Sequence, residues 1–312
     1  MPSPSARRAA SLATRSNGVP RRVAFVGPAV WLDGCAPEAA PGLIPETFPI
    51  SAGQKVAQAV ADLHAFGPDA TVVLDPLSIP PLGLGEDAGV SLGVLVGGMP
   101  AATDAKRLDA FDRLVSFRPA LTGRQAGRQS LWRAIPPPVS DALFGEPRPL
   151  HHSPRVMSVG RSTPHREKLL LPAKHHHDLF QVLHGVSGEP LAALLRDYDV
   201  GVYVSPEPGG GFGQQVGLHL AAGQLLVTDS LAPAHGLERD IDYVHFKDAG
   251  ELVAILDRLG RFPEMHQRVR VRGRMKAEQY RSSRLFARVV QDLLADVSAF
   301  GERAGHADPE PG

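Results

Sequence analysis

The sequence predicts an α/β protein with two Rossmann-like, doubly wound domains that face a cleft. Three observations support this fold class: short apolar strand patterns alternate with helical patterns, the alternation stops at a proline-rich stretch, and it then starts again. The chain has 312 residues, which is enough for two domains of ordinary size. With 43% apolar and 21% charged residues, its composition is that of a globular protein.

The amino-terminal half begins with an apolar run, RRVAFVG (21–27), which is typical of a buried parallel strand. Residues 52–67 then space their apolar side chains as a helix does, and the helix is expected to stop at Gly67 and Pro68. Further strands are predicted by runs of the same kind: ATVVLDP (70–76), SLGVLVGG (91–98) and RLVSF (113–117). We expect this domain to span residues 21–145, after a disordered tail over residues 1–20.

A proline-rich connector (134–154) separates the halves, because proline disfavours both helix interiors and central strands. The sequence after it predicts strands and helices again: RVMSVG (155–160), EPLAALLRDY (189–198), VGVYVSP (200–206), GLHLAAG (217–223), QLLVTDS (224–230) and DAGELVAILDRLG (248–260). Two more helical stretches follow. We expect the second domain to span residues 153–300, its last helix being free to cross back to the first domain, and residues 301–312 to form a disordered tail.

Charge and cysteine content narrow the function classes. A formal net charge of zero argues against a nucleic-acid-binding protein. The single cysteine, Cys35, excludes an internal disulfide and fits a reducing compartment, so a cytoplasmic location is expected. Residues 261–288 carry nine Lys and Arg against two Glu. Such a segment is either a solvated helix face or a peripheral membrane contact, and the sequence has no apolar run long enough to span a membrane.

Two segments that follow strands are candidates for anion binding. VGRSTPHREK (159–168) is expected to form a loop that presents Arg161 and Arg166, because guanidinium groups pair with phosphate bidentately. The glycines before a helix predicted at 214–222 would let the backbone approach an anion at the helix start, where N–H groups are free. An ordinary connecting loop with solvated cations explains the same residues equally well.

The motifs of the second half, taken in order, resemble group 1 glycosyltransferases with the GT-B fold. VGRSTPHRE (159–167) resembles the VGR-x-x-x-x-K/R turn that opens the donor half of that family. Phe212-Gly213, followed by LAAG (220–223), resembles its next motif, and HGLERDIDYVHFKDAGELVAILDRL (235–259) is similar to its last. The resemblance covers roughly residues 155–300. It implies a metal-independent transfer of sugar from a nucleotide-diphosphate sugar to an acceptor hydroxyl, with retention at the anomeric carbon.

The resemblance also implies roles for individual residues. Arg161 and Arg166 match the pair of cations that stabilises the nucleotide diphosphate, and they are the expected catalytic residues. The expected contacts to the donor come from one amino-terminal glycine and from the glycine-rich loop: Gly53, Glu207, Gly210, Gly211, Phe212 and Gly213. Neither a metal nor a cofactor besides the donor is expected. The expected acceptors are carbohydrates, lipid-linked molecules or other hydroxyl compounds, as in cell-envelope polysaccharide synthesis.

The sequence departs from the family at Leu218, where relatives carry the glutamate that holds the ribose. An apolar side chain cannot accept hydrogen bonds. Either another side chain takes over this role, with Gln214, Gln215 and His219 as the candidates, or nucleotide binding is altered. The second possibility leaves open a non-catalytic relative that binds nucleotide sugars or serves as a partner subunit. The histidines at 151–152 and 175–177 lack other ligands at metal-site spacing and are expected in surface loops.

Overall fold

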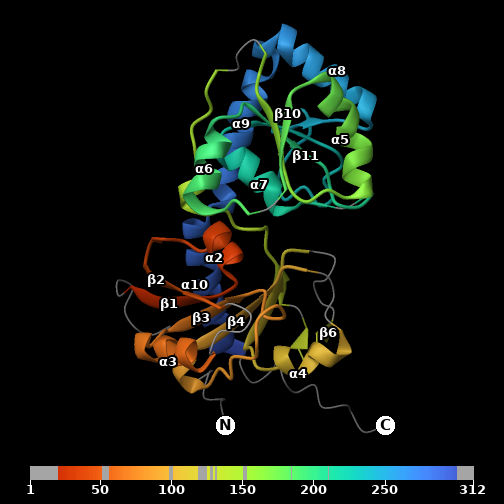
Figure 1. Ribbon diagram of the computed structural model, residues 1–312. Coiled ribbons are helices and arrows are strands. Elements are labelled where there is room, and N and C mark those ends of the chain that lie inside the picture. The colour runs from red at the N-terminus through yellow and green to blue at the C-terminus, as the bar shows by residue number, and fades with distance from the viewer. Residues whose placement is uncertain are drawn as a thin grey trace. The chain divides into compact units, whose positions relative to one another are not determined.

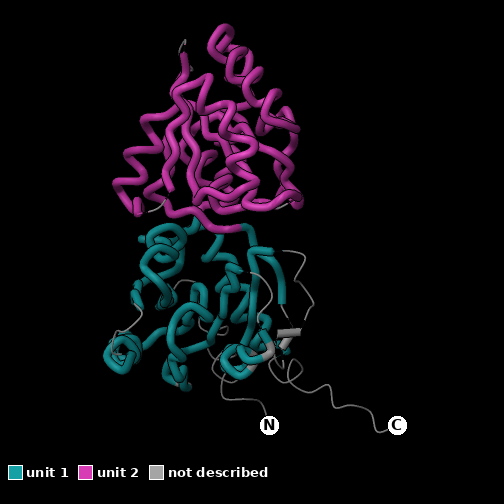
Figure 2. The backbone as a smooth tube through the Cα atoms, turned by 45° about the vertical axis from the view of Figure 1, so that its right-hand side comes forward, with its two compact units in different colours: residues 1–136, 282–312 teal, residues 137–281 magenta. Residues whose placement is uncertain are grey.

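The structure is a computed structural model that describes the following residues: 20–50, 56–97, 101–118, 125–126, 129–130, 132–149, 153–183, 185–209 and 211–300. Contacts divide the chain into two compact units (Figure 2). Unit 1 consists of Met1–Pro136 with Ser282–Gly312, and unit 2 of Pro137–Arg281. Residues 137–145 therefore pack with unit 2 and not with the amino-terminal domain, to which the sequence analysis assigned them.

Unit 1 contains a parallel sheet of six strands in the order β2-β1-β3-β4-β5-β8 (Figure 1). The strands are β1 (Arg21–Gly27), β2 (Leu43–Pro49), β3 (Ala70–Leu74), β4 (Val90–Leu95), β5 (Arg113–Ser116) and β8 (Arg133–Ala134). β3 and β4 are buried along their whole length, as their apolar runs predicted. β2 was not predicted, because it lies at the edge of the sheet and its prolines and exposed residues interrupt the apolar pattern.

Apolar clusters cover both faces of this sheet. α2 (Ala29–Cys35) and α10 (Ser282–Phe300) contribute to one cluster, and α3 (Val56–Phe66) contributes to the other. α10 follows the whole of unit 2 in the chain and crosses back to unit 1, where the Phe286 ring packs edge-on against Phe25. Short elements complete the unit: η1 (Glu86–Ala88), η2 (Ala102–Asp104), α4 (Ala105–Leu108), β6 (Gln125–Ala126) and β7 (Gln129–Ser130).

Unit 2 contains a parallel sheet of five strands in the order β10-β9-β11-β12-β13. The strands are β9 (Val156–Val159), β10 (Leu179–Val182), β11 (Val200–Tyr203), β12 (Leu225–Thr228) and β13 (Val244–His245). The helices are η4 (Asp141–Leu143), α5 (Pro164–His176), α6 (Gly188–Arg196), α7 (Gln214–Ala221), α8 (Ala249–Arg261), η5 (Pro263–His266), α9 (Gln267–Ala277) and η6 (Glu278–Tyr280). α5 and α8 pack on one face of the sheet, and α6 and α7 on the other. In the described part of the chain, no helix combines the length and the apolar character that crossing a bilayer requires.

Helix α5 corrects the expectation that residues 159–168 form a loop. The turn is short, and the helix begins at Pro164 because Thr163 caps it and proline suits the first helical position. The same helix includes His175 and His176, so the histidine cluster marks a helix end and not a surface loop. A threonine followed by proline is a helix-start signal, which the sequence analysis did not use.

Candidate functional site

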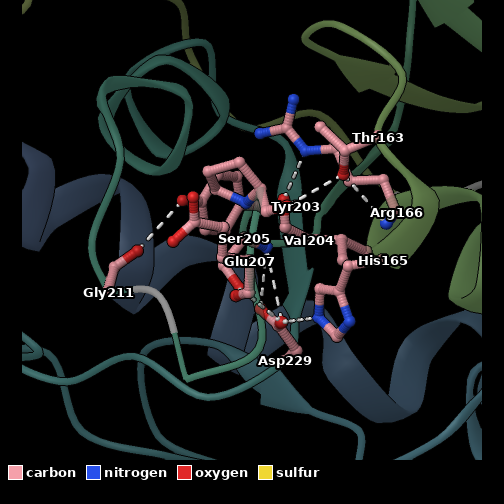
Figure 3. Close-up of polar contacts among 10 residues, drawn as sticks. Thr163, His165, Arg166, Tyr203, Val204, Ser205, Glu207, Gly211 and Asp229 are labelled. Atoms are coloured by element: carbon pink, nitrogen blue, oxygen red, sulfur yellow. Dashed lines mark hydrogen bonds and ion pairs between the residues drawn. The ribbon is translucent and has the colours of Figure 1, made fainter.

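The register of the parallel strands in unit 2 brings the ends of β9, β11 and β12 to one edge of the sheet. Val200, the first residue of β11, pairs with the first residues of β9 and β12. Gly160, Val204 and Asp229 follow the three strands and therefore emerge together. Ligands of open α/β sheets bind beyond this carboxyl edge. We therefore take the carboxyl edge as the candidate site; Figure 3 shows its polar contacts.

The turn between β9 and α5 is held in place by the hydroxyl of Thr163. Gly160 has a φ angle of 132°, which side chains disfavour. The Thr163 hydroxyl accepts a hydrogen bond from the Arg166 backbone N–H (3.2 Å) and donates one to the Pro206 carbonyl (2.9 Å). A helix cap of this kind contributes about 1 kcal/mol. The turn is thus attached to its own helix and also to the loop after β11 (Figure 3).

Arg166 points its side chain into this turn and is only 6% exposed. Its Nε donates to the Val204 carbonyl and its Nη1 to the Arg161 carbonyl, both at 2.8 Å. A Cβ on Gly160 would collide with Nη1, so the guanidinium occupies space that glycine leaves open. Burial lowers the pKa of Arg166, and among the described residues no carboxylate forms an ion pair with it. A positive charge without a paired carboxylate therefore lies at the carboxyl edge.

Arg161 lies beside Arg166, but the two side chains differ in their exposure to solvent. Its side chain is exposed, and its guanidinium has no hydrogen-bond or ion-pair partner in the described part of the chain. Its backbone carbonyl accepts the Arg166 hydrogen bond. The structure thus brings the two predicted arginines together, with Arg166 anchored and the guanidinium of Arg161 open to a ligand.

A buried network that the sequence analysis missed joins the ends of β11 and β12. The Asp229 carboxylate accepts hydrogen bonds from the backbone N–H of Ser205 (3.2 Å) and lies 2.9 Å from its hydroxyl. His165 Nε2, on the first turn of α5, lies 3.6 Å from the same carboxylate. The three residues come from separate segments, so no local pattern connects them. A prediction of α5 from Thr163-Pro164 would have placed His165 at this edge.

The glycine-rich loop between β11 and α7 approaches neighbouring groups closely at two positions. A Cβ on Gly211 would collide with the Ala232 carbonyl, and one on Gly213 would lie 2.6 Å from the Tyr203 hydroxyl. That hydroxyl donates to the Gly211 carbonyl at 3.0 Å, and burial raises the pKa of Tyr203 to about 12. The glycines therefore let the loop close over Tyr203. α7 then begins after Gly213 without a side-chain cap.

Of the other residues that we expected to contact the sugar donor, some lie at the surface and one lies in the core. The side chain of Glu207 is exposed, and Gln214 and Gln215 are half-buried at the start of α7. The Phe212 ring is buried and packs edge-on against two rings of the same unit, at centroid distances of 4.9 and 5.2 Å. Phe212 thus serves the core of unit 2, whereas the two glutamines remain near the carboxyl edge.

Leu218 is buried in the apolar cluster that α6 and α7 share. The next residue, His219, is fully buried, and its Nδ1 lies 2.6 Å from the side-chain oxygen of Gln224. Burial lowers the pKa of His219 to about 4, so the imidazole is neutral near pH 7. His219 is therefore a core residue and cannot replace the missing glutamate. Gln214 and Gln215 are the remaining candidates.

The remaining expectations concern metal ligands and a few residues that the structure does not describe. Within the residues that the structure describes, no group of three or more His, Cys, Asp or Glu is arranged to hold a metal ion. His177, at the end of α5, lies 3.4 Å from Asp257 and is part of no such group. Gly53, Gly210 and the histidines at 151–152 lie outside the described residues.

Comparison with known proteins identifies the fold. No protein-family model and no curated protein matches the sequence. HepE of Anabaena, solved with UDP and glucose, is 10% identical with a TM-score of 0.55, over 88% of this chain and 100% of that chain. Sucrose-phosphate synthase from Thermosynechococcus elongatus is 14% identical with a TM-score of 0.53, over 88% and 99%. AviGT4, a glycosyltransferase involved in avilamycin A biosynthesis, is 16% identical with a TM-score of 0.50, over 90% and 98%. This chain therefore has the two-domain α/β fold of GT-B glycosyltransferases.

Proposed function

We propose that the chain is a glycosyltransferase that moves a sugar from a nucleotide-diphosphate sugar to an acceptor hydroxyl. The observation that carries the proposal is the pair of arginines at the carboxyl edge of unit 2, where buried Arg166 lies beside exposed Arg161. HepE, which has a similar fold, was solved with UDP and with UDP-glucose, and this supports a donor of the same class. The order of the motifs favours the group 1 branch, whose members retain the anomeric configuration.

The carboxyl edge suits a leaving nucleoside diphosphate, whose negative charge grows as its bond to the sugar breaks. The Arg161 guanidinium can pair with two phosphate oxygens. The Arg166 charge acts from a buried position, where electrostatic interactions are stronger than in water. α7 begins at the same edge without a side-chain cap, and a helix start favours an anion. In this proposal the cations and the helix start supply the stabilisation, and no metal or further cofactor takes part.

The acceptor is proposed to be a hydroxyl of a carbohydrate or of a lipid-linked molecule. The support for this is the motif resemblance alone, because relatives of this kind assemble cell-envelope polysaccharides. The network of Ser205, Asp229 and half-buried His165 would then hold the donor loop in place.

A second candidate function is a non-catalytic GT-B relative that binds nucleotide sugars or serves as a partner subunit. Leu218 favours it, because this residue is buried in the core where relatives carry the ribose-binding glutamate. Gln214 and Gln215 lie at the start of the same helix, and their amides can accept hydrogen bonds from a ribose. The two candidates therefore differ in turnover and not necessarily in binding.

Calorimetric titration with UDP, GDP and their sugars, combined with a donor-hydrolysis assay, tests the proposal. We expect a nucleoside diphosphate to bind and Arg161→Ala to weaken binding about tenfold or more, since a hydrogen bond to a charged group is lost. Arg196→Ala is the matched control, because Arg196 is an exposed arginine at the end of α6. Binding with slow hydrolysis supports the transferase, whereas binding without hydrolysis or transfer supports the second candidate. If no nucleotide binds, the transferase is wrong and the second candidate is favoured in its form as a partner subunit.

A further inference from the structure

We propose that the exposed side of η5 and α9 in unit 2 docks on an anionic lipid bilayer. This docking face consists of three arginines and four large apolar side chains: Arg261, Arg268, Arg272, Phe262, Met265, Val271 and Met275. All seven side chains are exposed. The chemistry of this surface is independent of the proposed transfer reaction.

The spacing of the docking-face residues in η5 and α9 places them on one side of a helix; Arg261 and Phe262, at the end of α8, directly precede η5. η5 leads directly into α9 (Figure 1), and Met265, Arg268, Arg272 and Met275 follow one another at intervals of three or four positions. This is the repeat of residues that share a helix face. Val271 lies between them on the same side. The opposite side of α9 is buried within unit 2, so the docking face points away from the core.

The apolar side chains of the docking face are unusually accessible for their size. Phe262, Met265 and Met275 are 51%, 55% and 68% exposed. Single exposed apolar side chains are ordinary, but a group of them beside arginines suits a bilayer interface, which offers an apolar layer beneath anionic phosphates. The apolar chains enter the boundary of the acyl region there, while the guanidinium groups remain at the level of the lipid phosphates.

The tertiary structure separates the basic residues of this region into two groups. Arg270 and Arg274 are buried and donate hydrogen bonds to backbone carbonyls at 2.6 and 2.5 Å. They hold the helix to unit 2 and are not available to a partner. Arg261, Arg268 and Arg272 are exposed. Within unit 2, the exposed arginines of residues 261–281 are therefore the three of the docking face, whereas Arg284 and Arg288 are exposed on α10 of unit 1.

Charge complementarity identifies the partner. Glu264 is the one acidic residue within residues 261–276, and the Asp242 carboxylate near Arg272, at 3.6 Å, is itself buried. The docking face thus presents positive charge, which attracts the headgroups of anionic phospholipids. A soluble acidic protein would satisfy the arginines, but it would leave the exposed Phe262 and methionines without an apolar environment. A bilayer satisfies both.

Sedimentation of the full chain with phospholipid vesicles tests the proposal. We expect binding to vesicles of phosphatidylcholine and phosphatidylserine, weaker binding at high salt, and little binding to phosphatidylcholine alone. Arg261→Glu with Arg268→Glu should lower the partition coefficient at least about tenfold, because each arginine near the surface adds to the attraction. Met265→Ser with Met275→Ser should lower it by a similar factor. Unchanged thermal unfolding midpoints show that these variants are folded.

Arg118→Glu with Arg288→Glu is the matched control, because it makes the same change of charge at two exposed arginines of unit 1. This variant should bind the vesicles like the unmodified chain. The proposal is overturned if the unmodified chain does not sediment with anionic vesicles, or if all variants bind equally. Binding to soluble polyglutamate that matches vesicle binding and is insensitive to the methionine substitutions would indicate an acidic protein partner instead, and would also overturn it.

Discussion

Two buried arginines of unit 2 lie at opposite edges of the same sheet and differ in how their charge is balanced. Arg166 lies at the carboxyl edge and Arg270 at the amino edge, and they are 6% and 2% exposed. Both donate to backbone carbonyls, Arg270 through its Nε to Gly223 at 2.6 Å. The Nη2 of Arg270 lies 3.9 Å from the buried Asp199 carboxylate. Arg166 forms no ion pair with a described residue.

The difference shows at which edge the buried positive charge is balanced within the protein and at which edge an anionic ligand could balance it. At the amino edge the buried charge has its counter-charge inside the protein, although burial still lowers the pKa of Arg270 to about 10. At the carboxyl edge the buried positive charge has only dipoles and the more distant Asp229 around it. We therefore expect substitution of Arg166 to affect chemistry on an anionic ligand, and substitution of Arg270 to affect stability.

The largest effect is expected for Arg166→Met. Donor turnover should fall about 10²–10³-fold, because a positioned group that stabilises the charge of the leaving diphosphate is lost. Arg166→Lys keeps the charge and should retain much more activity. Urea unfolding must accompany the assay, since two carbonyls lose a donor and stability should fall by about 1–3 kcal/mol. Full turnover in a folded Arg166→Met protein would show that Arg166 does not stabilise the leaving group.

The next effect is expected for Arg270→Met. The free energy of unfolding should fall by about 3 kcal/mol, because the Asp199 carboxylate is left buried without a counter-charge. Urea unfolding measures it, and nucleotide binding to the folded protein should not change. The double variant Arg270→Met, Asp199→Asn should recover part of the loss. Equal losses in the single and double variants would show that the pair is not coupled.

The smallest effect is expected for the titration of His219, which lies near the amino edge against Gln224. Its pKa is lowered to about 4 in the folded protein from an unfolded value of 6.5, so the unfolded chain binds the proton first. The stability that neutral His219 contributes is therefore present above about pH 6.5 and is lost as the pH falls toward 4. Between pH 7 and 4.5 the loss should be about 2 kcal/mol.

Urea unfolding of the unmodified chain and of His219→Asn at both pH values measures this loss. The variant should show less pH dependence by that amount, while the other histidines titrate in both proteins. An identical pH dependence of the two proteins would mean that His219 is not the group responsible.

The parts of the fold that the sequence predicted are those with strong local patterns. β3 and β12 are buried along their length, so their apolar runs identified them. β2 and β10 were missed, because each lies at a sheet edge and has exposed residues between buried ones. α5 was missed over its whole length, because its apolar pattern is weak and only its capping threonine and proline mark its start.

As with the fold, only the parts of the candidate site that have a local sequence pattern were predicted. The motif VGRSTPHRE identified Arg161 and Arg166, and the glycine-rich loop was located correctly before α7. The sequence could not show that the Phe212 ring and His219 belong to the core, since the residues that bury them are distant in the chain. Asp229 and Ser205 were missed for the same reason: their contact joins the ends of two strands.

By itself, the sequence determined the alternation of strands and helices, the two halves and the clustering of glycines and cations before helices. These features depend on the local repeat of apolar residues and on local backbone preferences. Only the tertiary structure decided which cations are buried and which are exposed. Arg166 and Arg270 are enclosed, whereas Arg161 and Arg268 remain in solvent. Burial of a charge depends on carbonyls and carboxylates supplied by other segments of the chain, and no local pattern encodes the distant ones.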